Sequence, residues 1–146
     1  MEAVIFVGVQ ASGKSSFFKE RFFRTHVRIS LDLLRTRHRE AVFLGACLDT
    51  RQPFVVDKVN ATRAQRSAYI TAAKNAGFRV VGYYFCSSVE DCLRRNAARH
   101  PDERVPDKAI LGTYKRLQIP TLEEGFDELL SIRLEDGHFL TEAWQP

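Results

Sequence analysis

One nine-residue stretch constrains the fold of this chain more than any other. Residues 8–16 read Gly-Val-Gln-Ala-Ser-Gly-Lys-Ser-Ser, and they follow an apolar run over 3–7 that is typical of a buried strand. The stretch fits the pattern G-x-x-x-x-G-K-[ST] and leads into an expected helix over 14–24. Glycines let consecutive backbone N–H groups point toward phosphate oxygens, and the helix adds its positive end. The motif therefore predicts a phosphate-binding loop between a strand and a helix.

Strand-length apolar runs alternate with helix-length amphipathic stretches along the chain. The expected strands cover 4–7, 26–29, 54–56, 79–85 and 129–134. The expected helices cover 14–24, 31–48, 62–75, 89–99 and 107–117. Such alternation is typical of a parallel sheet covered on both faces. We therefore predict an α/β three-layer sandwich of the P-loop NTPase type, with a central, mostly parallel five-stranded sheet.

The chain, residues 1–146, reads as one domain. Its composition is 45% hydrophobic, which is enough for a single buried core. No apolar run approaches the roughly 20 residues that cross a bilayer. The apolar start is short and follows Glu2, unlike a signal peptide. We therefore expect a soluble, cytoplasmic protein with no membrane partner.

The three cysteines, Cys47, Cys86 and Cys92, are odd in number and lack the spacing of metal ligands. In the cytoplasm, thiols are kept reduced. We expect three reduced thiols that are mostly buried.

Positive charge is concentrated in a few places. The net charge is +4, and arginines cluster at 35–39, at 63 and 66, and at 94–104. Clustered charge of one sign favours an anionic partner. For any single arginine, a solvated helix face is the simpler explanation.

The loop at the start of the chain is assigned to a phosphate donor, ATP or another nucleoside triphosphate. Lys14 would reach the β- and γ-phosphates, and the Ser15 hydroxyl would bind Mg²⁺. The loop residues assigned to donor binding are Gly8, Gln10, Ala11, Ser12, Gly13, Lys14, Ser15 and Ser16.

A second motif begins where the second expected strand ends. Asp32 and Arg35 are three residues apart, so they share a face at the start of a helix. A carboxylate beside the terminal phosphate can take a proton from an attacking hydroxyl, and an arginine there can hold an anionic acceptor. The alternative is that Asp32 favours the helix N-terminus and pairs locally with Arg35. Position alone does not decide between the two.

The apolar strand over 54–56 ends in Asp57, an arrangement like the Walker B motif, in which the carboxylate supports Mg²⁺ or its serine ligand. An ordinary strand-to-helix turn is the alternative. Asn60 is expected to cap the next helix. Arg63 and Arg66 would then oppose the helix dipole, which favours a nearby anion, although solvent exposure would also explain them. With Arg35, we assign Asp57, Asn60 and Arg63 to the acceptor side.

A third group of arginines precedes the break at His100-Pro101. Arg95 and Arg99 are four residues apart on one face of an expected helix, with Arg94 and Arg104 on either side. We expect a lid over about 94–106 that closes over the triphosphate and neutralises the transferring group. A basic surface helix is the alternative.

Together these motifs resemble the polynucleotide 5′-hydroxyl kinases, most of all the kinase domain of the bifunctional polynucleotide kinase–phosphatases. The resemblance spans roughly residues 3–134. It rests on G-x-x-x-x-G-K-S, D-x-x-R, V-V-D-x-x-N-x-x-x-x-x-R and R-N-A-A-R, followed by V-P-D and Tyr-x-x-x-x-I-P-T-L-E-E-G-F. The first two motifs occur in several P-loop kinases, whereas the ordered set with its tail is much more specific.

The resemblance implies a role for each matched position. Lys14 and Ser15 would serve ATP and Mg²⁺, with Asp57 supporting the site. Asp32 would be the general base on the 5′-hydroxyl, and Arg35 would contact the phosphate on the 3′ side of the nucleotide being phosphorylated. The lid arginines Arg95 and Arg99 would neutralise the ATP phosphates, so the residues expected to act in catalysis are Asp32, Lys14 and Arg99.

The chain departs from the family pattern at a few positions. Ala11 replaces a frequent glycine, which requires ordinary backbone angles there, and Ser16 replaces a frequent threonine. Lys58-Val59 removes the threonine of D-x-T-N, which bears on acceptor preference. No D-x-D-x-T phosphatase signature occurs, so no 3′-phosphatase activity is expected.

We therefore expect an ATP-dependent kinase for the 5′-hydroxyl end of DNA or RNA, with partners in repair or ligation. Two alternatives stay open. One is a P-loop kinase for a small metabolite, antibiotic or sugar nucleotide. The other is a module that binds or hydrolyses ATP without an acceptor. The tail over 138–146 matches no motif, and either an edge strand or a seal against a partner would suit it.

Overall fold

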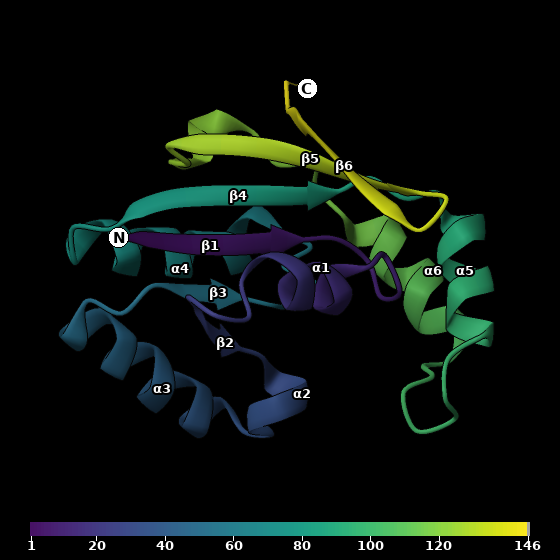
Figure 1. Ribbon diagram of the computed structural model, residues 1–146, viewed down its shortest axis with the longest axis horizontal. Coiled ribbons are helices and arrows are strands. Elements are labelled where there is room, and N and C mark those ends of the chain that lie inside the picture. Colours follow the sequence, from purple (N-terminus) through teal and green to yellow (C-terminus); the bar gives the residue numbers. More distant parts are fainter. Residues whose placement is uncertain (146) are drawn as a thin grey trace.

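A twisted sheet forms the middle layer of the computed structural model, which describes residues 1–145 (Figure 1). Its strand order is β2-β3-β1-β4-β5-β6. The strands are β1 Glu2–Val7, β2 Val27–Ile29, β3 Phe54–Val56, β4 Arg79–Phe85, β5 Glu128–Glu135 and β6 His138–Ala143. The first five pair in parallel, and β6 runs antiparallel to β5. The predicted fold class is confirmed.

The predicted number of strands is wrong, because the sheet has six strands and not five. The additional strand, β6, lies in the tail and forms the edge of the sheet. A two-residue turn at Asp136-Gly137 joins it to β5, and both residues have positive φ, 49° and 76°. Such a turn matches the right-handed twist of the two strands it connects. Pro146, the end of the tail, lies outside the described residues.

Six α-helices and one short 3₁₀ helix surround the sheet over residues 1–145. They are α1 Lys14–Arg21, α2 Leu31–Leu34, α3 Arg37–Thr50, α4 Arg63–Asn75, α5 Val89–Ala97, α6 Asp107–Arg116 and η1 Leu122–Glu124. The expected single helix over 31–48 is wrong. The chain breaks at Arg35, whose φ is 76°, and Thr36 caps α3 by accepting the Arg39 N–H at 3.1 Å.

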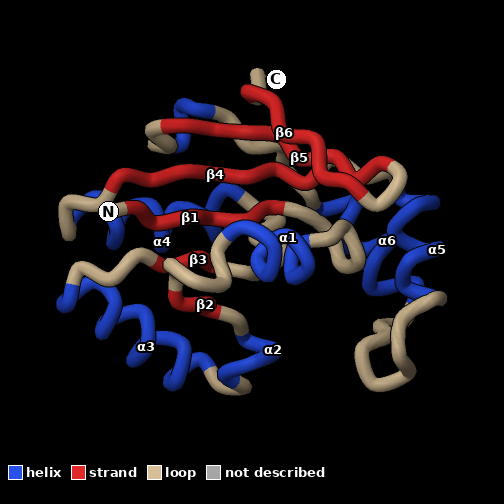
Figure 2. Tube along the Cα trace, viewed as in Figure 1, coloured by secondary structure: helices blue, strands red, loops and turns tan. Residues whose placement is uncertain are grey.

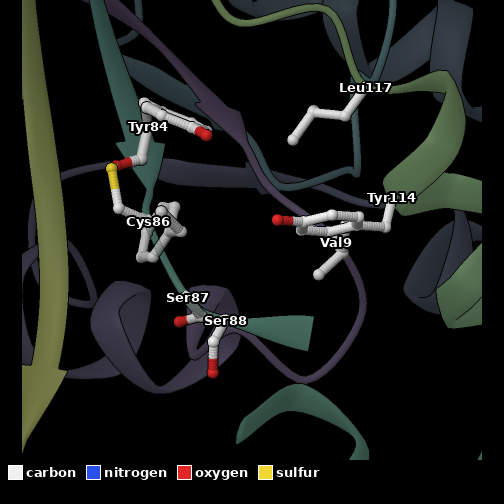
Figure 3. A pocket seen from close by; sticks show the side chains of 8 residues that line it. Val9, Tyr84, Cys86, Ser87, Ser88, Tyr114 and Leu117 are labelled. Carbon is white, nitrogen blue, oxygen red and sulfur yellow. The ribbon is translucent and has the colours of Figure 1, made fainter. Parts of the chain in front are cut away.

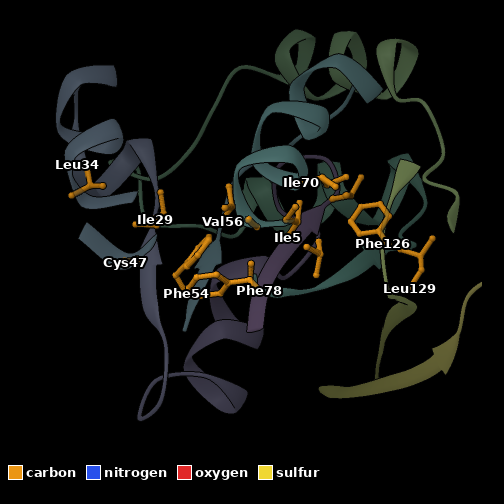
Figure 4. Close-up of a cluster of buried hydrophobic side chains, with 14 residues drawn as sticks. Ile5, Ile29, Leu34, Cys47, Phe54, Val56, Ile70, Phe78, Phe126 and Leu129 are labelled. Carbon is orange, nitrogen blue, oxygen red and sulfur yellow. The ribbon is translucent and has the colours of Figure 1, made fainter. Parts of the chain in front are cut away.

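The two faces of the sheet carry separate apolar cores. Phe6 and Val55 face α1, where they pack with Phe17. Ile5 and Val56 face α3 and α4 in the larger cluster (Figure 4). Alternate strand residues therefore serve opposite layers, as expected for a sheet buried on both faces.

The carboxyl ends of the parallel strands lie at one edge of the sheet, where the motif loops emerge. The helices α5 and α6 pack on each other beyond the ends of β1 and β4 (Figures 1 and 2). In folds of this type, ligands bind at this edge.

The cysteine prediction is confirmed, because Cys47, Cys86 and Cys92 are free thiols and two of them are buried. Between residues 1 and 145, no helix combines the length and the apolar character needed to cross a bilayer.

Candidate functional site: a phosphate loop between two groups of arginines

The loop between β1 and α1 is closely packed and partly left-handed. A Cβ added at Gly8 would lie 2.9 Å from both Phe85 Cβ and Ser12 Oγ, so only glycine fits. Gly13 has a φ of 101°. The expectation of ordinary backbone angles at Ala11 is wrong, because its φ is 64°. The course of the loop therefore imposes a left-handed conformation on a residue with a Cβ, which costs roughly 1–2 kcal/mol.

Lys14 opens α1 and folds back over this loop. Its Nζ donates to the carbonyl oxygens of Gly8 and Val9, at 2.8 and 2.7 Å. Burial lowers the pKa of Lys14 to about 8, and the carboxylates of Asp57 and Asp32 oppose that shift. The chain thus holds a buried ammonium inside the loop, as the motif requires.

One hydroxyl inside the loop has no partner among residues 1–145. Ser12 is 2% exposed, and its Oγ accepts and donates no hydrogen bond. The Oε1 atom of Gln10 is also buried without a partner, while its Nε2 donates to Thr113 on α6 at 3.1 Å. Buried polar groups are normally paired. The open group at Ser12, beside the buried Lys14, fits a loop that takes up phosphate.

Ser15 and Asp57 meet, as predicted for a pair that holds a metal. Ser15 Oγ donates to Asp57 Oδ2 at 3.2 Å, and Asp57 is buried at the end of β3. A third residue, Arg28 on β2, binds both of them. We did not predict the role of Arg28. Its place between the apolar Val27 and Ile29 nevertheless implied that its side chain points to the other face of the sheet from theirs. Over residues 1–145 no group of three or more His, Cys, Asp or Glu side chains could hold a metal. The Ser15 hydroxyl and the Asp57 carboxylate are oxygen groups of the kind that Mg²⁺ binds, usually together with phosphates and water.

Asp32 and Arg35 lie at the end of β2, and both are exposed. They form no ion pair with each other, so local pairing does not explain them. Arg35 is the centre of a tight turn in which the Thr36 N–H donates to the Leu34 carbonyl at 2.9 Å. A γ-turn with positive φ at its centre is rare and strained. Strain of this kind is concentrated at functional sites.

The start of α4 differs from the prediction. Thr62, not Asn60, caps the helix, and a reciprocal pair of hydrogen bonds joins it to Gln65. Asn60 is buried with φ 47°, and its Nδ2 donates to the Phe6 carbonyl at 2.8 Å. Arg63 is exposed at the surface and donates to Thr121 Oγ1 at 2.8 Å.

The anion near Arg66 belongs to the protein itself. The guanidinium of Arg66 is fully buried and forms an ion pair with Glu124, on η1. It also donates to the carbonyls of Asn60 and Ala61, at 2.9 and 3.2 Å. This arginine therefore belongs to the core and not to a ligand site.

The expected lid divides into two parts. Arg95 lies on α5 and reaches the phosphate loop, where its Nη1 donates to the Ala11 carbonyl at 3.3 Å and to Ser87 Oγ at 3.1 Å. Arg99 lies beyond the end of the helix, so the two arginines do not share a helical face as expected. Its charge lowers the pKa of Lys14, while its Nη1 donates to the Glu103 carbonyl at 3.3 Å, within the segment that follows α5. The loop after α5 is closed by Asn96, whose side chain exchanges two hydrogen bonds with the Val105 backbone.

A cavity of about 300 Å³ adjoins the phosphate loop at Val9 (Figure 3). Tyr84 and Tyr114 lie on opposite sides of it, and Ser87 and Ser88 line its floor. Burial raises the pKa of Tyr84 to about 12, so its phenol stays protonated at neutral pH. The cavity lies at the end of β4, on the other side of β1 from Asp32.

Comparisons with known proteins agree with this arrangement. The sequence profile described as "AAA domain" matches residues 40–120. A curated relative, the bifunctional polynucleotide phosphatase/kinase of Schizosaccharomyces pombe, is 28% identical over 129 residues, which are 86% of this chain and 32% of that protein. The chain thus spans about a third of the length of this relative. The match confirms the resemblance drawn from the motifs.

Two solved structures share the fold. Kti12 from Chaetomium thermophilum, in complex with ADP-AlF3, has a TM-score of 0.69 and 16% identity, with 92% of this chain and 90% of that chain covered. A gluconokinase from Sinorhizobium meliloti 1021 has a TM-score of 0.62 and 19% identity, with 90% and 82% covered. At such identities the likeness concerns the fold, which is that of the P-loop kinases.

Proposed function

This chain belongs to the AAA domain family, and on that premise we propose that it is an ATP-dependent polynucleotide 5′-hydroxyl kinase. It would transfer the γ-phosphate of ATP to the 5′-hydroxyl end of DNA or RNA. The observation that carries the proposal is the match to the polynucleotide phosphatase/kinase over 86% of the chain. The motifs on which the acceptor assignment rests are those of the same kind of enzyme.

The donor side is supported by the phosphate loop. Lys14 and the unpaired hydroxyl of Ser12 supply a charge and a hydrogen-bonding group inside the loop. Ser15 and Asp57 are the groups that would hold Mg²⁺. When bound, Mg²⁺ would neutralise charge on the phosphates. Arg95 and Arg99 would add positive charge from the lid.

The acceptor side is supported by Asp32 and Arg35. Asp32 lies on α2, directly after the parallel strand β2, so its carboxylate is at the same edge of the sheet as the phosphate loop, and its charge raises the pKa of Lys14. It would accept the proton of the attacking hydroxyl. Arg35 would hold the phosphate on the 3′ side, and the exposed Arg37 and Arg39 continue this positive surface along α3. A polymer with several phosphates suits such a surface better than a single small acceptor.

One rival is supported by a specific observation. The fold is shared with a gluconokinase, so a small polyol or sugar acceptor is the second candidate. The exposed Arg35 favours an anionic acceptor over a neutral sugar, but it would suit a sugar acid such as gluconate as well as a polynucleotide, so the acceptor assay must separate these two. A module that holds ATP without any acceptor would leave the exposed carboxylate of Asp32 without a role.

The deciding experiment incubates the protein with γ-labelled ATP and matched 5′-hydroxyl DNA and RNA oligonucleotides, beside a panel that includes gluconate. We expect label on the oligonucleotides, and a steep loss of acceptor affinity as salt rises from 50 to 200 mM, which marks phosphate contacts. Oligonucleotides that already carry a 5′-phosphate are the control and should take up no label. Label on a small molecule alone, or release of phosphate with no acceptor dependence, would overturn the proposal.

A further inference from the structure

Arg28 is the residue of the site that no motif predicted. It is the middle residue of β2, and it pairs in register with Val55 on β3. Its neighbours Val27 and Ile29 pack into the core that faces α3 and α4. Because successive side chains of a strand alternate, Arg28 projects from the opposite face, the one that Val55 shares with α1. The edge of the sheet thus directs its guanidinium toward the first turn of α1.

The guanidinium lies between the two groups suited to hold a metal. Its Nε donates to Asp57 Oδ2 at 2.8 Å, and its Nη2 donates to Ser15 Oγ at 2.9 Å. The Ser15 hydroxyl donates in turn to the same Asp57 oxygen at 3.2 Å, so the three side chains form a closed ring. The Asp57 side chain is 3% exposed, whereas that of Arg28 is 28% exposed and so borders on solvent.

This ring uses two of the three hydrogen-bonding positions of the Ser15 hydroxyl and leaves one lone pair open. A hydroxyl has one donor hydrogen and two lone pairs, and here Asp57 takes the hydrogen and Arg28 takes one lone pair. The guanidinium is always charged, so it neutralises the buried carboxylate of Asp57. A divalent cation bound to Ser15 Oγ would lie directly beside this charge, and like charges at such distances repel.

We propose that Arg28 is a resident cation of the site, which competes with Mg²⁺ for Ser15 and Asp57. In the nucleotide-free protein it holds the two side chains together, and it releases Ser15 when a metal–nucleotide complex binds. Arg28 is thus a positioning residue that raises the metal concentration the site requires. This inference rests on the proposed function, because it assumes that the loop binds a metal-bound nucleotide.

The test measures metal coupling without any phosphoryl transfer. Calorimetry gives the Kd of ADP in EDTA and the Kd of ADP in Mg²⁺. The Kd in EDTA divided by the Kd in Mg²⁺ is the coupling ratio, which is larger when the metal helps nucleotide binding more. Removing a partly exposed competing charge should raise this ratio about threefold to tenfold in Arg28→Gln. The matched control is Arg24→Gln, which removes the same charge from an exposed position just after α1 and should leave the ratio unchanged. Arg28→Lys keeps the charge but loses the two-pronged contact, so its coupling ratio should lie between that of the wild type and that of Arg28→Gln.

Unfolding temperatures separate this role from a merely structural one. Arg28→Gln should unfold at a lower temperature than the wild type in EDTA, and the difference should shrink in Mg²⁺ with ADP. An equal loss under both conditions, with an unchanged coupling ratio, would overturn the role of Arg28. If the wild type binds no nucleotide at all, the proposed function fails and this inference fails with it. Nucleotide binding with unchanged coupling overturns the inference alone.

Discussion

Arg66 on α4 and Glu124 on η1 form a two-pronged ion pair inside the protein. Arg66 Nε lies 2.7 Å from Glu124 Oε1, Arg66 Nη2 lies 3.0 Å from Oε2, and the arginine side chain has no exposed surface. This pair joins the helix after β3 to the segment that leads into β5, which is 58 residues further along the chain.

Breaking this pair should be costly. Arg66→Met removes the buried partner of a carboxylate that is 7% exposed, and the loss of one partner of a buried pair costs about 3–5 kcal/mol. Urea unfolding measures the change. Arg63→Met is the control, because Arg63 is half exposed and lies 3.8 Å from the same carboxylate, so it should cost less than about 1 kcal/mol. Equal costs would show that burial of the pair does not matter.

Glycine at position 11 should stabilise the protein. Ala11→Gly relieves a left-handed conformation, a gain of about 1 kcal/mol after the greater freedom of glycine in the unfolded chain is subtracted. Ala46→Gly, in the middle of α3, is the control and should lower the stability, because glycine in a helix costs about 1 kcal/mol. Thermal unfolding of both variants tests the pair. A loss of stability in Ala11→Gly would contradict the assigned backbone.

The burial of Lys14 predicts a pH-dependent stability difference. Its pKa is about 8 in the folded protein and near 10.5 when exposed, so the unfolded chain binds more protons between these values. Burial of the charged lysine therefore lowers the free energy of unfolding by about 3 kcal/mol below pH 8. This loss disappears as the pH rises toward 10. Methionine also loses the hydrogen bonds to Gly8 and Val9 at every pH, so the measured quantity is the difference in unfolding free energy between Lys14→Met and the wild type, which should shift by about 3 kcal/mol in favour of the wild type between pH 8 and 10. A constant gap across this window would refute the shift.

Asp32 should be needed for transfer and not for donor binding. Asp32→Asn removes the proposed base while keeping the shape of the side chain, so kcat should fall at least about a hundredfold, as for general bases elsewhere. The Kd of ADP, measured by calorimetry, should change less than about threefold. Asp49→Asn, on the exposed far end of α3, is the control and should retain full activity. Substantial transfer by Asp32→Asn would reject its role as base.

Two substitutions at Arg35 separate its chemistry from its backbone strain. Arg35→Ala and Arg35→Gly both remove the guanidinium, so both should raise the KM for the oligonucleotide by about the same factor. Of the two new residues, only glycine adopts a φ of 76° without strain, so Arg35→Gly should be more stable than Arg35→Ala by about 1 kcal/mol. Steady-state kinetics and urea unfolding provide the two readouts. A KM change confined to ATP would count against an acceptor role.

Local patterns predicted most of the fold, and two overlooked local signals explain two of the errors. The Asp136-Gly137 pair is a strong hairpin signal, and it implied the sixth strand. Thr62 and Gln65 have the spacing of a capping box, which marks the true start of α4. By contrast, the apolar spacing over 31–48 reads as one helix, and nothing local reveals the break at Arg35.

Other features depend on contacts between distant residues and could not be predicted from one sequence. Glu124 is the partner of Arg66 only because η1 packs on α4. The ring of Arg28, Ser15 and Asp57 combines three separate elements at one edge of the sheet. The residue types were visible in the sequence, but their convergence depends on the register of β2 with β3.

The edge strand β6 has a consequence for the order of folding. Phe139 lies against the phosphate loop, since a Cβ at Gly13 would be 3.1 Å from its ring. The ribosome releases the loop long before it synthesises this phenylalanine, and contacts so far apart in sequence form late. A nascent chain that stops short of β6 would lack the ring of Phe139 and would leave one side of the aromatic cluster around Phe17 uncovered.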